Sequence, residues 1–415
     1  MLVECFKLVD SVEKRVLIRS TKGLPFASPI LAFLTVSACG GGSNSVDGGD
    51  DSSPQSRNYS GAVIKGPLEN AVVFLDYDGD GVLGVDEPSM RTAADGSFSL
   101  TGTVEGAGFV AQTDETTLDT SSGEILNNVT LKAPAGASVV TPATTIMKEA
   151  GITKEEVAAV LGLPEGVDPT TFNPFGADVD PVQALAVEKI SQQVMTTITA
   201  VSTAIESAGG DSVDAFAMAL ETVVEVVQEK AEAIKTLPAG SSVEINFSDV
   251  AEIEAVTAKV SVKIEEQGIA STESFEAVKS QLEIAVSNVN SKINEVTDLN
   301  SEEAMAAFAI SSELNSQVKE AVEAKGDSTA VISFVDVGAI ENSQAEKVAE
   351  IKEKIDSGEL VLRPQPEVPV DPEVPGGPEE PEVPVGPEVP GGPEDPEVPV
   401  DPEAPGGPED PEVPV

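Results

Sequence analysis

The chain contains the stretch Asp76-Tyr77-Asp78-Gly79-Asp80-Gly81-Val82-Leu83-Gly84-Val85-Asp86-Glu87, whose residues are spaced as in a twelve-residue, EF-hand-like calcium loop. Aspartates stand at loop positions 1, 3 and 5, a glycine at position 6 and a glutamate at position 12. Calcium takes six to eight oxygen ligands, and alternate residues of a tight loop can direct carboxylates towards one point. The alternative is an acidic, glycine-rich surface turn. The full pattern predicts bound Ca²⁺.

Six residues are the candidate metal ligands by their loop positions: Asp76, Asp78, Asp80, Val82, Gly84 and Glu87. The four acidic residues would supply carboxylates, and the glutamate would bind through both oxygens. The valine would supply its backbone carbonyl, and the glycine at position 9 a bridging water. Gly81 permits the sharp turn that this geometry needs.

The flanks of the loop predict strands, although an EF-hand has a helix on each side. Residues 71–75 (AVVFL) are apolar and β-branched, which is typical of a strand. After the loop come Pro88, the Asp95-Gly96 turn and the alternating run 97–100 (SFSL). Asp-Gly between two extended runs predicts a hairpin. We therefore expect the loop to join strands of a small sheet.

These residues carry a resemblance. Residues 61–67 (GAVIKGP), the strand before the loop, the loop itself, Glu87-Pro88 and residues 95–98 (DGSF) resemble the calcium-loop β-sandwich modules of bacterial surface proteins. Such modules include the B-type repeats of Gram-positive adhesins and related modules in secreted proteins of marine proteobacteria. The resemblance covers about residues 60–200. It implies Asp76, Asp78, Asp80 and Glu87 as calcium ligands and implies no catalytic residue.

The composition excludes several classes of function. The 415 residues include 24 Lys plus Arg against 72 Asp plus Glu, which gives a net charge of −48. Nucleic-acid binding needs a basic surface, so it is not expected. Histidine is absent, which removes imidazole bases and ordinary zinc sites. We therefore expect no enzyme; catalysis by a pair of carboxylates is the remaining enzymatic alternative.

The N-terminal segment predicts export and lipid anchoring. Basic residues precede an apolar run, residues 23–38, that is short for a membrane span. The run closes with Val36-Ser37-Ala38-Cys39, which resembles a bacterial lipobox. Acylation of Cys39 would anchor the chain in the membrane, and Gly40 in place of an aspartate favours the outer membrane. The alternative is an ordinary secretory signal cleaved after Ala38.

The middle of the chain predicts strands followed by helices. Strands are expected at residues 62–65, 71–75, 97–100, 108–112 and 128–132. Residues 113–124 form a solvated loop or, alternatively, hold a second and weaker cation. Beyond residue 142, Thr153-Lys154-Glu155-Glu156 is a capping box, and Asp180-Pro181 begins a long helix. Narrow apolar stripes at spacings of three and four predict five helices with polar outer faces, packed as an elongated bundle or as a globular helical core.

The C-terminal segment is a repeat. Proline stands at every third position from Pro366 to Pro414, between many carboxylates. This pattern predicts an extended polyproline II spacer. The last repeat stops early, so we also expect either a truncated gene model or a further domain after Val415.

Together these features predict a multidomain α+β protein: a small β-sandwich with a calcium loop, an elongated helical bundle and a disordered polyproline II tail. The expected divisions are a signal peptide (1–38), a flexible tether (39–58), the β-sandwich (59–135), the helical region (136–360) and the Pro/Glu/Val-rich tail (361–415). The expected function is that of a calcium-binding outer-membrane lipoprotein with a structural or adhesive role at the cell surface. A calcium-dependent binding module for a glycan or protein ligand is the alternative.

Overall fold

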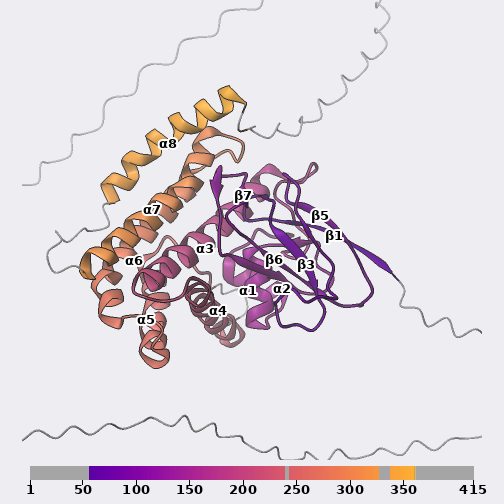
Figure 1. Ribbon diagram of the computed structural model, residues 1–415, viewed down its shortest axis with the longest axis horizontal. Coiled ribbons are helices and arrows are strands. Elements are labelled where there is room, and N and C mark those ends of the chain that lie inside the picture. Colours follow the sequence, from indigo (N-terminus) through magenta and orange to yellow (C-terminus); the bar gives the residue numbers. More distant parts are fainter. Residues whose placement is uncertain (1–55, 239–242, 327–336, 359, 361–415) are drawn as a thin grey trace, which may run out of the picture. The chain divides into compact units, whose positions relative to one another are not determined.

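The protein has a mixed α+β fold in which short strands precede the helices (Figure 1). The computed structural model describes residues 56–238, 243–326, 337–358 and 360. The predicted signal segment, Cys39, most of the tether and the proline repeat lie outside these residues. The strands are β1 (Arg57–Val63), β2 (Leu68–Glu69), β3 (Val72–Asp76), β4 (Ser89–Arg91), β5 (Ser97–Gly102), β6 (Gly108–Gln112), β7 (Leu118–Asp119), β8 (Glu124–Ile125), β9 (Thr130–Ala133) and β10 (Val139–Val140). The helices are α1 (Pro142–Ala150), α2 (Lys154–Leu161), α3 (Pro181–Ser207), α4 (Ser212–Thr236), α5 (Val250–Gln267), α6 (Thr272–Glu295), α7 (Glu302–Gly326) and α8 (Val337–Ser357).

The described strands form three small sheets, with the orders β10-β1-β5, β2-β7-β8 and β4-β3-β6-β9. Apart from the parallel pair β1 and β10, neighbouring strands are antiparallel. The sheets share apolar side chains: Phe98 from β5 meets Phe109 from β6 edge to face, with ring centroids 5.0 Å apart. This contact joins the first sheet to the four-stranded one.

The five predicted strands are confirmed, with shifted ends, but the pairing expected around Asp95-Gly96 is wrong. The turn itself forms, because the N–H of Gly96 donates to the carbonyl of Ala93 (2.8 Å). However, β4 before the turn pairs with β3, and β5 after it pairs with β1. The turn therefore passes the chain from one sheet to another. A local turn signal cannot reveal which partners the two strands choose.

The predicted helix starts are confirmed. Thr153 and Glu156 cap α2 reciprocally: each side chain accepts the backbone N–H of the other residue. At α3, the Asp180 side chain accepts the N–H groups of Val182 and Gln183, and Pro181 occupies the first turn, where its missing N–H costs nothing. These caps satisfy donors that the helices leave without intrahelical partners.

Helix α3 is central, and here the expectation of a narrow apolar stripe is wrong. It packs against α1, α4, α6 and α7. The predicted stripe residues Val194, Ile198, Val201 and Ile205 are buried, but the polar side chains between them are buried too. The buried polar residues of α3 are Glu188, Ser191, Gln192, Gln193, Thr196, Thr197 and Ser202. Neighbouring elements therefore cover α3 on its polar faces as well, which the periodicity of one helix cannot predict.

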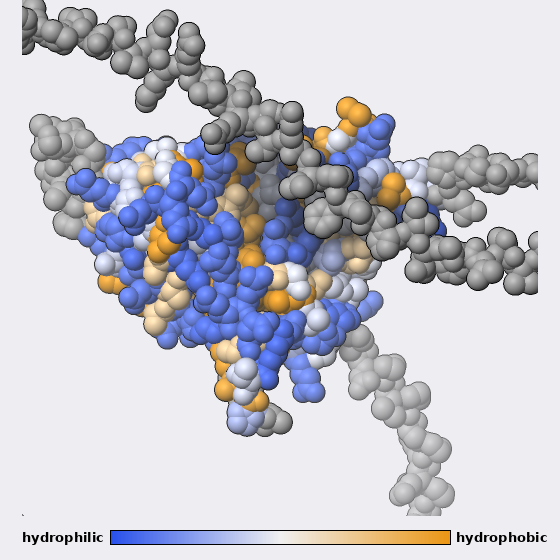
Figure 2. Space-filling view, turned by 90° about the horizontal axis from the view of Figure 1, so that it is seen from below, coloured by the Kyte–Doolittle hydropathy of each residue, from blue (hydrophilic) through white to orange (hydrophobic). Residues whose placement is uncertain are grey.

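One cluster of buried apolar side chains contains residues from both the strands and the helices, from Val63 to Val322. The cluster continues across residue 135, and the division of the chain at that point stays a prediction. The surface in Figure 2 is predominantly hydrophilic, with scattered hydrophobic residues. Among the described large apolar residues, three of the more exposed ones belong to the acidic loop: Val82, Leu83 and Val85.

Candidate metal centre

The acidic loop joins two neighbouring strands of the four-stranded sheet. It leaves β3 at Asp76 and returns to β4, which pairs antiparallel with β3. The N–H of Leu75 donates to the carbonyl of Pro88 (3.2 Å), which closes the neck of the loop. The loop therefore lies between strands, as the flanking residues predicted, and the sheet fixes both of its ends.

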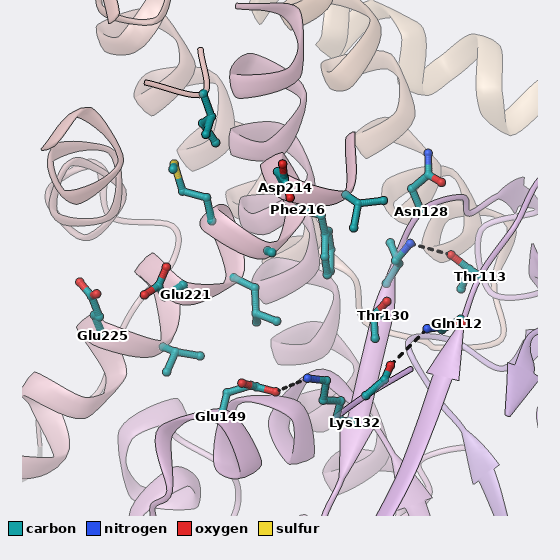
Figure 3. A pocket seen from close by; sticks show the side chains of 18 of the residues that line it. Gln112, Thr113, Asn128, Thr130, Lys132, Glu149, Asp214, Phe216, Glu221 and Glu225 are labelled. Carbon is teal, nitrogen blue, oxygen red and sulfur yellow. Dashed lines mark hydrogen bonds and ion pairs between the residues drawn. The ribbon is translucent and has the colours of Figure 1, made fainter. Parts of the chain in front are cut away.

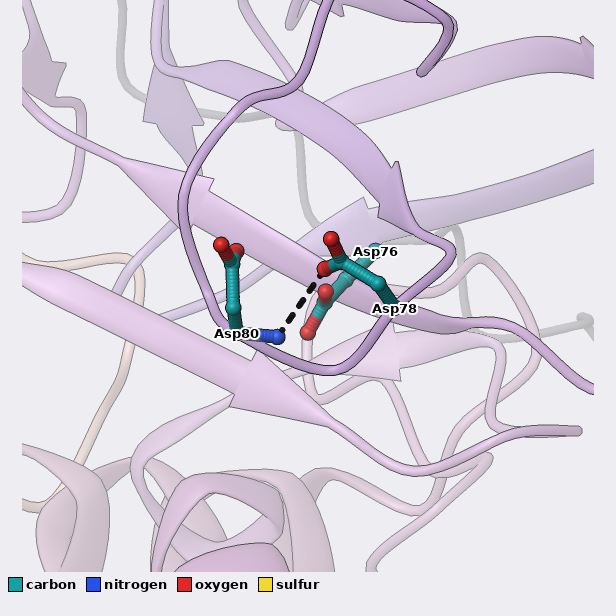
Figure 4. Close-up of side chains that lie close together, drawn as sticks. All are labelled: Asp76, Asp78 and Asp80. Carbon is teal, nitrogen blue, oxygen red and sulfur yellow. Dashed lines mark hydrogen bonds between the residues drawn. The ribbon is translucent and has the colours of Figure 1, made fainter. Parts of the chain in front are cut away.

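Three of the predicted ligands lie together. One carboxylate oxygen from each of Asp76, Asp78 and Asp80 lies within 4.8 Å of the others (Figure 4). Asp76 is buried at the end of β3, whereas the other two are exposed. Three such carboxylates repel one another, and a cation bound among them would remove this repulsion. The group can hold a metal ion.

Backbone N–H groups orient these carboxylates. Asp76 Oδ1 accepts the N–H of Gly79 (2.8 Å), and Asp78 Oδ1 accepts the N–H of Asp80 (3.2 Å). Asp80 Oδ1 in turn accepts the N–H of Val82 (2.7 Å). Each side chain thus caps the turn that follows it, which holds the loop coiled around the cluster.

Gly81 has the backbone conformation that the pattern predicted for position 6. Its φ is +77°, in the left-handed region that residues with a Cβ rarely adopt. A Cβ there would also lie 3.2 Å from the Nζ of Lys132 on β9. The carbonyl of Gly81 accepts a hydrogen bond from Gln112 Nε2 (3.4 Å), so the sharp turn is held against β6.

The other predicted ligands have different surroundings. Glu87 is not part of the three-residue group; its Oε1 accepts the N–H of Tyr77 (2.6 Å) and its Oε2 the N–H of Gly84 (2.8 Å). Its carboxylate therefore connects the beginning and the end of the loop. Gly84 is held by this contact, and the Val82 side chain points to solvent, with 64 % of its surface exposed.

A lysine from the first helix reaches the cluster. Lys148 of α1 places its Nζ 3.4 Å from Asp76 Oδ2. Beside this contact lies a cleft of about 390 Å³, lined by Asp76, Asp78, Glu105 and Lys148 among others. The lysine offsets part of the negative charge of the loop and connects the loop to α1. The sequence pattern missed Lys148 because it lies 72 residues from Asp76.

A second and larger groove adjoins the loop at Gly81. It has a volume of about 930 Å³ and runs between the β6 and β9 region and helix α4 (Figure 3). Four carboxylates line it, from Glu149, Asp214, Glu221 and Glu225. Glu149 pairs with Lys132 (2.7 Å), and Lys263 pairs with the two glutamates of α4. These residues are scattered along the chain, so no motif predicted the groove.

The prediction that residues 113–124 form a solvated loop is wrong at Asp119. The side chain of Asp119, at the end of β7, is 1 % exposed and forms an ion pair with Lys65 (2.7 Å). Asp114 in the same segment pairs with Arg91, and hydrogen bonds from Arg91 and Thr116 hold the pKa of Asp114 well below its usual range. Each of these acids already has a protein cation as its partner.

No family model, curated protein or solved structure matches this chain. Among the described residues, none of the helices combines the length and the apolar character that crossing a membrane requires.

Proposed function

We propose that this chain is a calcium-binding lipoprotein of the bacterial cell envelope, with a structural or adhesive role at the surface and no catalytic activity. The observation that carries the calcium part is the convergence of Asp76, Asp78 and Asp80 within 4.8 Å. All three ligands are carboxylate oxygens, and such ligands suit hard cations. The twelve-residue spacing favours Ca²⁺ among these cations. Val82, Gly84 and Glu87 remain the proposed further ligands.

The β-sandwich, the helical bundle and the extended spacer are part of the same proposal. The contact of Phe98 with Phe109 across two sheets supports a small β-sandwich. The packing of α3 against α4, α6 and α7 supports a helical bundle. Calcium would act as a folding cofactor that fixes the β3–β4 connection, and the proline-rich repeat from Pro366 would act as an extended spacer.

Calcium binding can be tested with terbium, whose luminescence is excited through a nearby aromatic ring. Tyr77 lies inside the loop, the chain has only two tyrosines, and it has no tryptophan. We expect terbium emission that calcium displaces. Calcium at one hundred times its dissociation constant should also stabilise the fold by about 2.7 kcal/mol, because it binds only the folded form. Asp78→Asn should remove both effects.

Two variants sharpen this test. Asp86→Asn removes one exposed negative charge from the same loop but lies outside the three-residue group, so it should keep calcium binding. Glu87→Gln should lower stability without calcium as well, because glutamine has a single acceptor oxygen and one of the two backbone N–H groups of Tyr77 and Gly84 loses its acceptor. Equal melting temperatures with calcium and with chelator in the unmodified protein would reduce the loop to an acidic turn.

The proposed anchor has its own test. Cys39 follows the apolar run, and acylation of its thiol and new N-terminus would give stable membrane attachment. We expect the mature protein to partition into the detergent phase and to begin at Cys39. Cys39→Ser should shift the protein to the soluble phase or leave an unprocessed precursor, whereas Cys5→Ser should change nothing. A mature N-terminus at another residue would contradict the lipoprotein assignment.

A calcium-dependent binding module for a glycan or a protein ligand is the second candidate. The cleft of about 390 Å³ beside Asp76 and Asp78 favours it, because an outside oxygen ligand could reach a bound cation there. Binding of a surface glycan or protein that disappears with Asp78→Asn would favour this candidate over a purely structural role.

A further inference from the structure

The tip of the acidic loop exposes a cluster of apolar side chains. Val82, Leu83 and Val85 are 64 %, 39 % and 102 % exposed, and they fall within four consecutive residues. The other exposed large apolar side chains of the described residues stand singly in the sequence. Single exposed apolar residues are ordinary, whereas a group of neighbouring ones is typical of a surface that contacts a protein or a membrane. Calcium binding alone does not account for this exposure.

Hydrogen bonds hold this tip beside the metal ligands. Gly84, between two of the apolar residues, donates its N–H to Glu87 Oε2 (2.8 Å), and Glu87 Oε1 accepts the N–H of Tyr77 at the start of the loop (2.6 Å). The N–H of Val82 donates to Asp80 Oδ1 (2.7 Å). The apolar tip and the three aspartates are therefore parts of one hydrogen-bonded loop, and a surface that covers the tip also approaches the carboxylates.

The first strand begins at the same end of the sheet. Arg57, the first residue of β1, places its Nη1 2.7 Å from Glu105 Oε1. Glu105 and its neighbour Val104, which is 37 % exposed, line the cleft of about 390 Å³ together with Asp76 and Asp78. The polypeptide therefore enters the described fold beside the calcium loop, and Val104 adds an exposed apolar side chain at that end.

The position of this entry point matters because the proposed lipid anchor precedes it. Cys39 lies 18 residues before Arg57, and a chain of that length reaches at most about 60 Å. An acylated Cys39 would keep the loop at a high local concentration near the bilayer surface. A contact between tip and lipid that is weak by itself then suffices, because two weak membrane signals together give stable attachment.

We propose that the loop tip is a calcium-dependent membrane contact, in which Val82, Leu83 and Val85 enter the headgroup region of a bilayer that carries anionic phosphate groups. This inference rests on the calcium site and the lipid anchor of the proposed function. Calcium takes six to eight oxygens, and the three aspartates with the Val82 carbonyl supply fewer. Asp78 and Asp80 are exposed, so lipid phosphate oxygens can reach a cation bound there. Without the cation, the carboxylates and the phosphates repel one another.

A bilayer fits this tip better than a protein partner does. Stable protein interfaces bury about 800 Å² on each side and have aromatic or arginine side chains near their centres. The tip, residues 82–85 (VLGV), has only aliphatic side chains on a short loop. Such side chains can enter lipid without a partner of complementary shape. A second copy of the chain is disfavoured, because each copy has a net charge of −48 and the same acidic loop.

A fluorophore at the tip tests this contact. In the proposed mature protein Cys5 is cleaved off and Cys39 is acylated, so Val85→Cys introduces the single free thiol. The full mature protein is labelled with a polarity-sensitive dye and reconstituted into vesicles of phosphatidylethanolamine and phosphatidylglycerol, some of which carry a quencher on their acyl chains. We expect calcium to shift the emission to the blue and to increase its quenching, and chelator to reverse both changes.

Three variants assign the parts of the contact. Val262→Cys, at an exposed valine of α5 (54 %), is the control label, and its emission should not respond to calcium. With the label at position 85, Asp78→Asn should abolish the calcium response. Val82→Ser together with Leu83→Ser should lower the ratio of inserted to free tip by about tenfold, because apolar side chains leave water less favourably once shortened and made polar. This double variant should keep its terbium emission, since no carboxylate is changed.

The outcomes separate this inference from the proposed function. Protein that does not enter the vesicles refutes the anchor, and missing terbium emission refutes the calcium site; either result removes the basis of the membrane contact. Normal terbium emission with a dye at position 85 that calcium leaves unchanged overturns the membrane contact alone. A calcium-dependent blue shift that needs no vesicles and grows with protein concentration also overturns it, because a second copy would then cover the tip.

Discussion

Glu188→Gln should stabilise the protein by up to about 5 kcal/mol at pH 8 and above, and by much less at pH 4. Glu188 is fully buried, and desolvation is the largest cause that raises its pKa, from 4.5 to about 8. Each unit of pKa difference corresponds to about 1.4 kcal/mol. Glutamine has nearly the same shape, and its side-chain oxygen can still accept the hydrogen bond from Gln192. It removes the charge that is costly to bury.

The direction in which stability changes with pH follows from how Glu188 binds its proton in the unfolded and in the folded state. The unfolded chain loses the proton of Glu188 near pH 4.5, whereas the folded chain keeps it until about pH 8. Between these values the folded state binds more protons, so stability falls as pH rises. Above pH 8 both states are ionised at this residue and its contribution is constant. The neutral side chain of Glu188→Gln has no such dependence.

Denaturant titrations of the two proteins across pH 4–9 measure the difference. Glu206→Gln is the matched control, since Glu206 is an exposed glutamate on the same helix α3. The control should follow the unmodified protein within about 0.5 kcal/mol at each pH. If the curves for Glu188→Gln and the unmodified protein stay parallel over the whole range, Glu188 ionises normally in the folded state and the raised pKa is wrong.

The local features of this chain could be predicted from its sequence. The spacing of the acidic residues from Asp76 to Glu87 predicts the loop, and Gly81 predicts its sharp turn. The β-branched run 71–75 predicts the strand before the loop. The caps at Thr153 and Asp180 are equally local, because a cap needs only the residue and the next three positions. Each of these signals is contained within about twelve residues, so the rest of the fold is not needed to interpret it.

The contacts that no local pattern predicts are between distant residues. The polar neighbours of Asp119 predict a solvated loop, yet the partner of Asp119 is Lys65, 54 residues earlier. Gln192 contacts Lys65 across 127 residues. The buried polar side chains of α3 likewise depend on which elements surround it, and no single helix pattern contains that information. A polar residue in a sequence ordinarily predicts an exposed side chain. A single sequence therefore does not reveal a cluster of polar side chains that the fold buries.

The same central helix gives the second large effect: Ile198→Ala should destabilise the protein by about 2–5 kcal/mol. Ile198 is 1 % exposed and belongs to the apolar cluster that strands and helices share. Truncation removes three buried carbon atoms and leaves a cavity that the surrounding helices can fill only in part. Because α3 packs against α1, α4, α6 and α7, the loss should lower the stability of strands and helices together.

Thermal or denaturant unfolding followed by circular dichroism measures this effect, and Val182→Ala is the control on the same helix. Val182 is 76 % exposed, so its truncation should change stability by less than about 0.5 kcal/mol. Calcium titration of Ile198→Ala distinguishes a defect in the core from a defect in the calcium loop. The variant should start from a lower stability, but calcium should raise its free energy of unfolding by as much as in the unmodified protein, because this increase depends on the affinity of the site and the calcium concentration. A loss confined to the helical signal, with an unchanged calcium-dependent transition, would mean that the strands and the helices unfold independently and that α3 does not connect them.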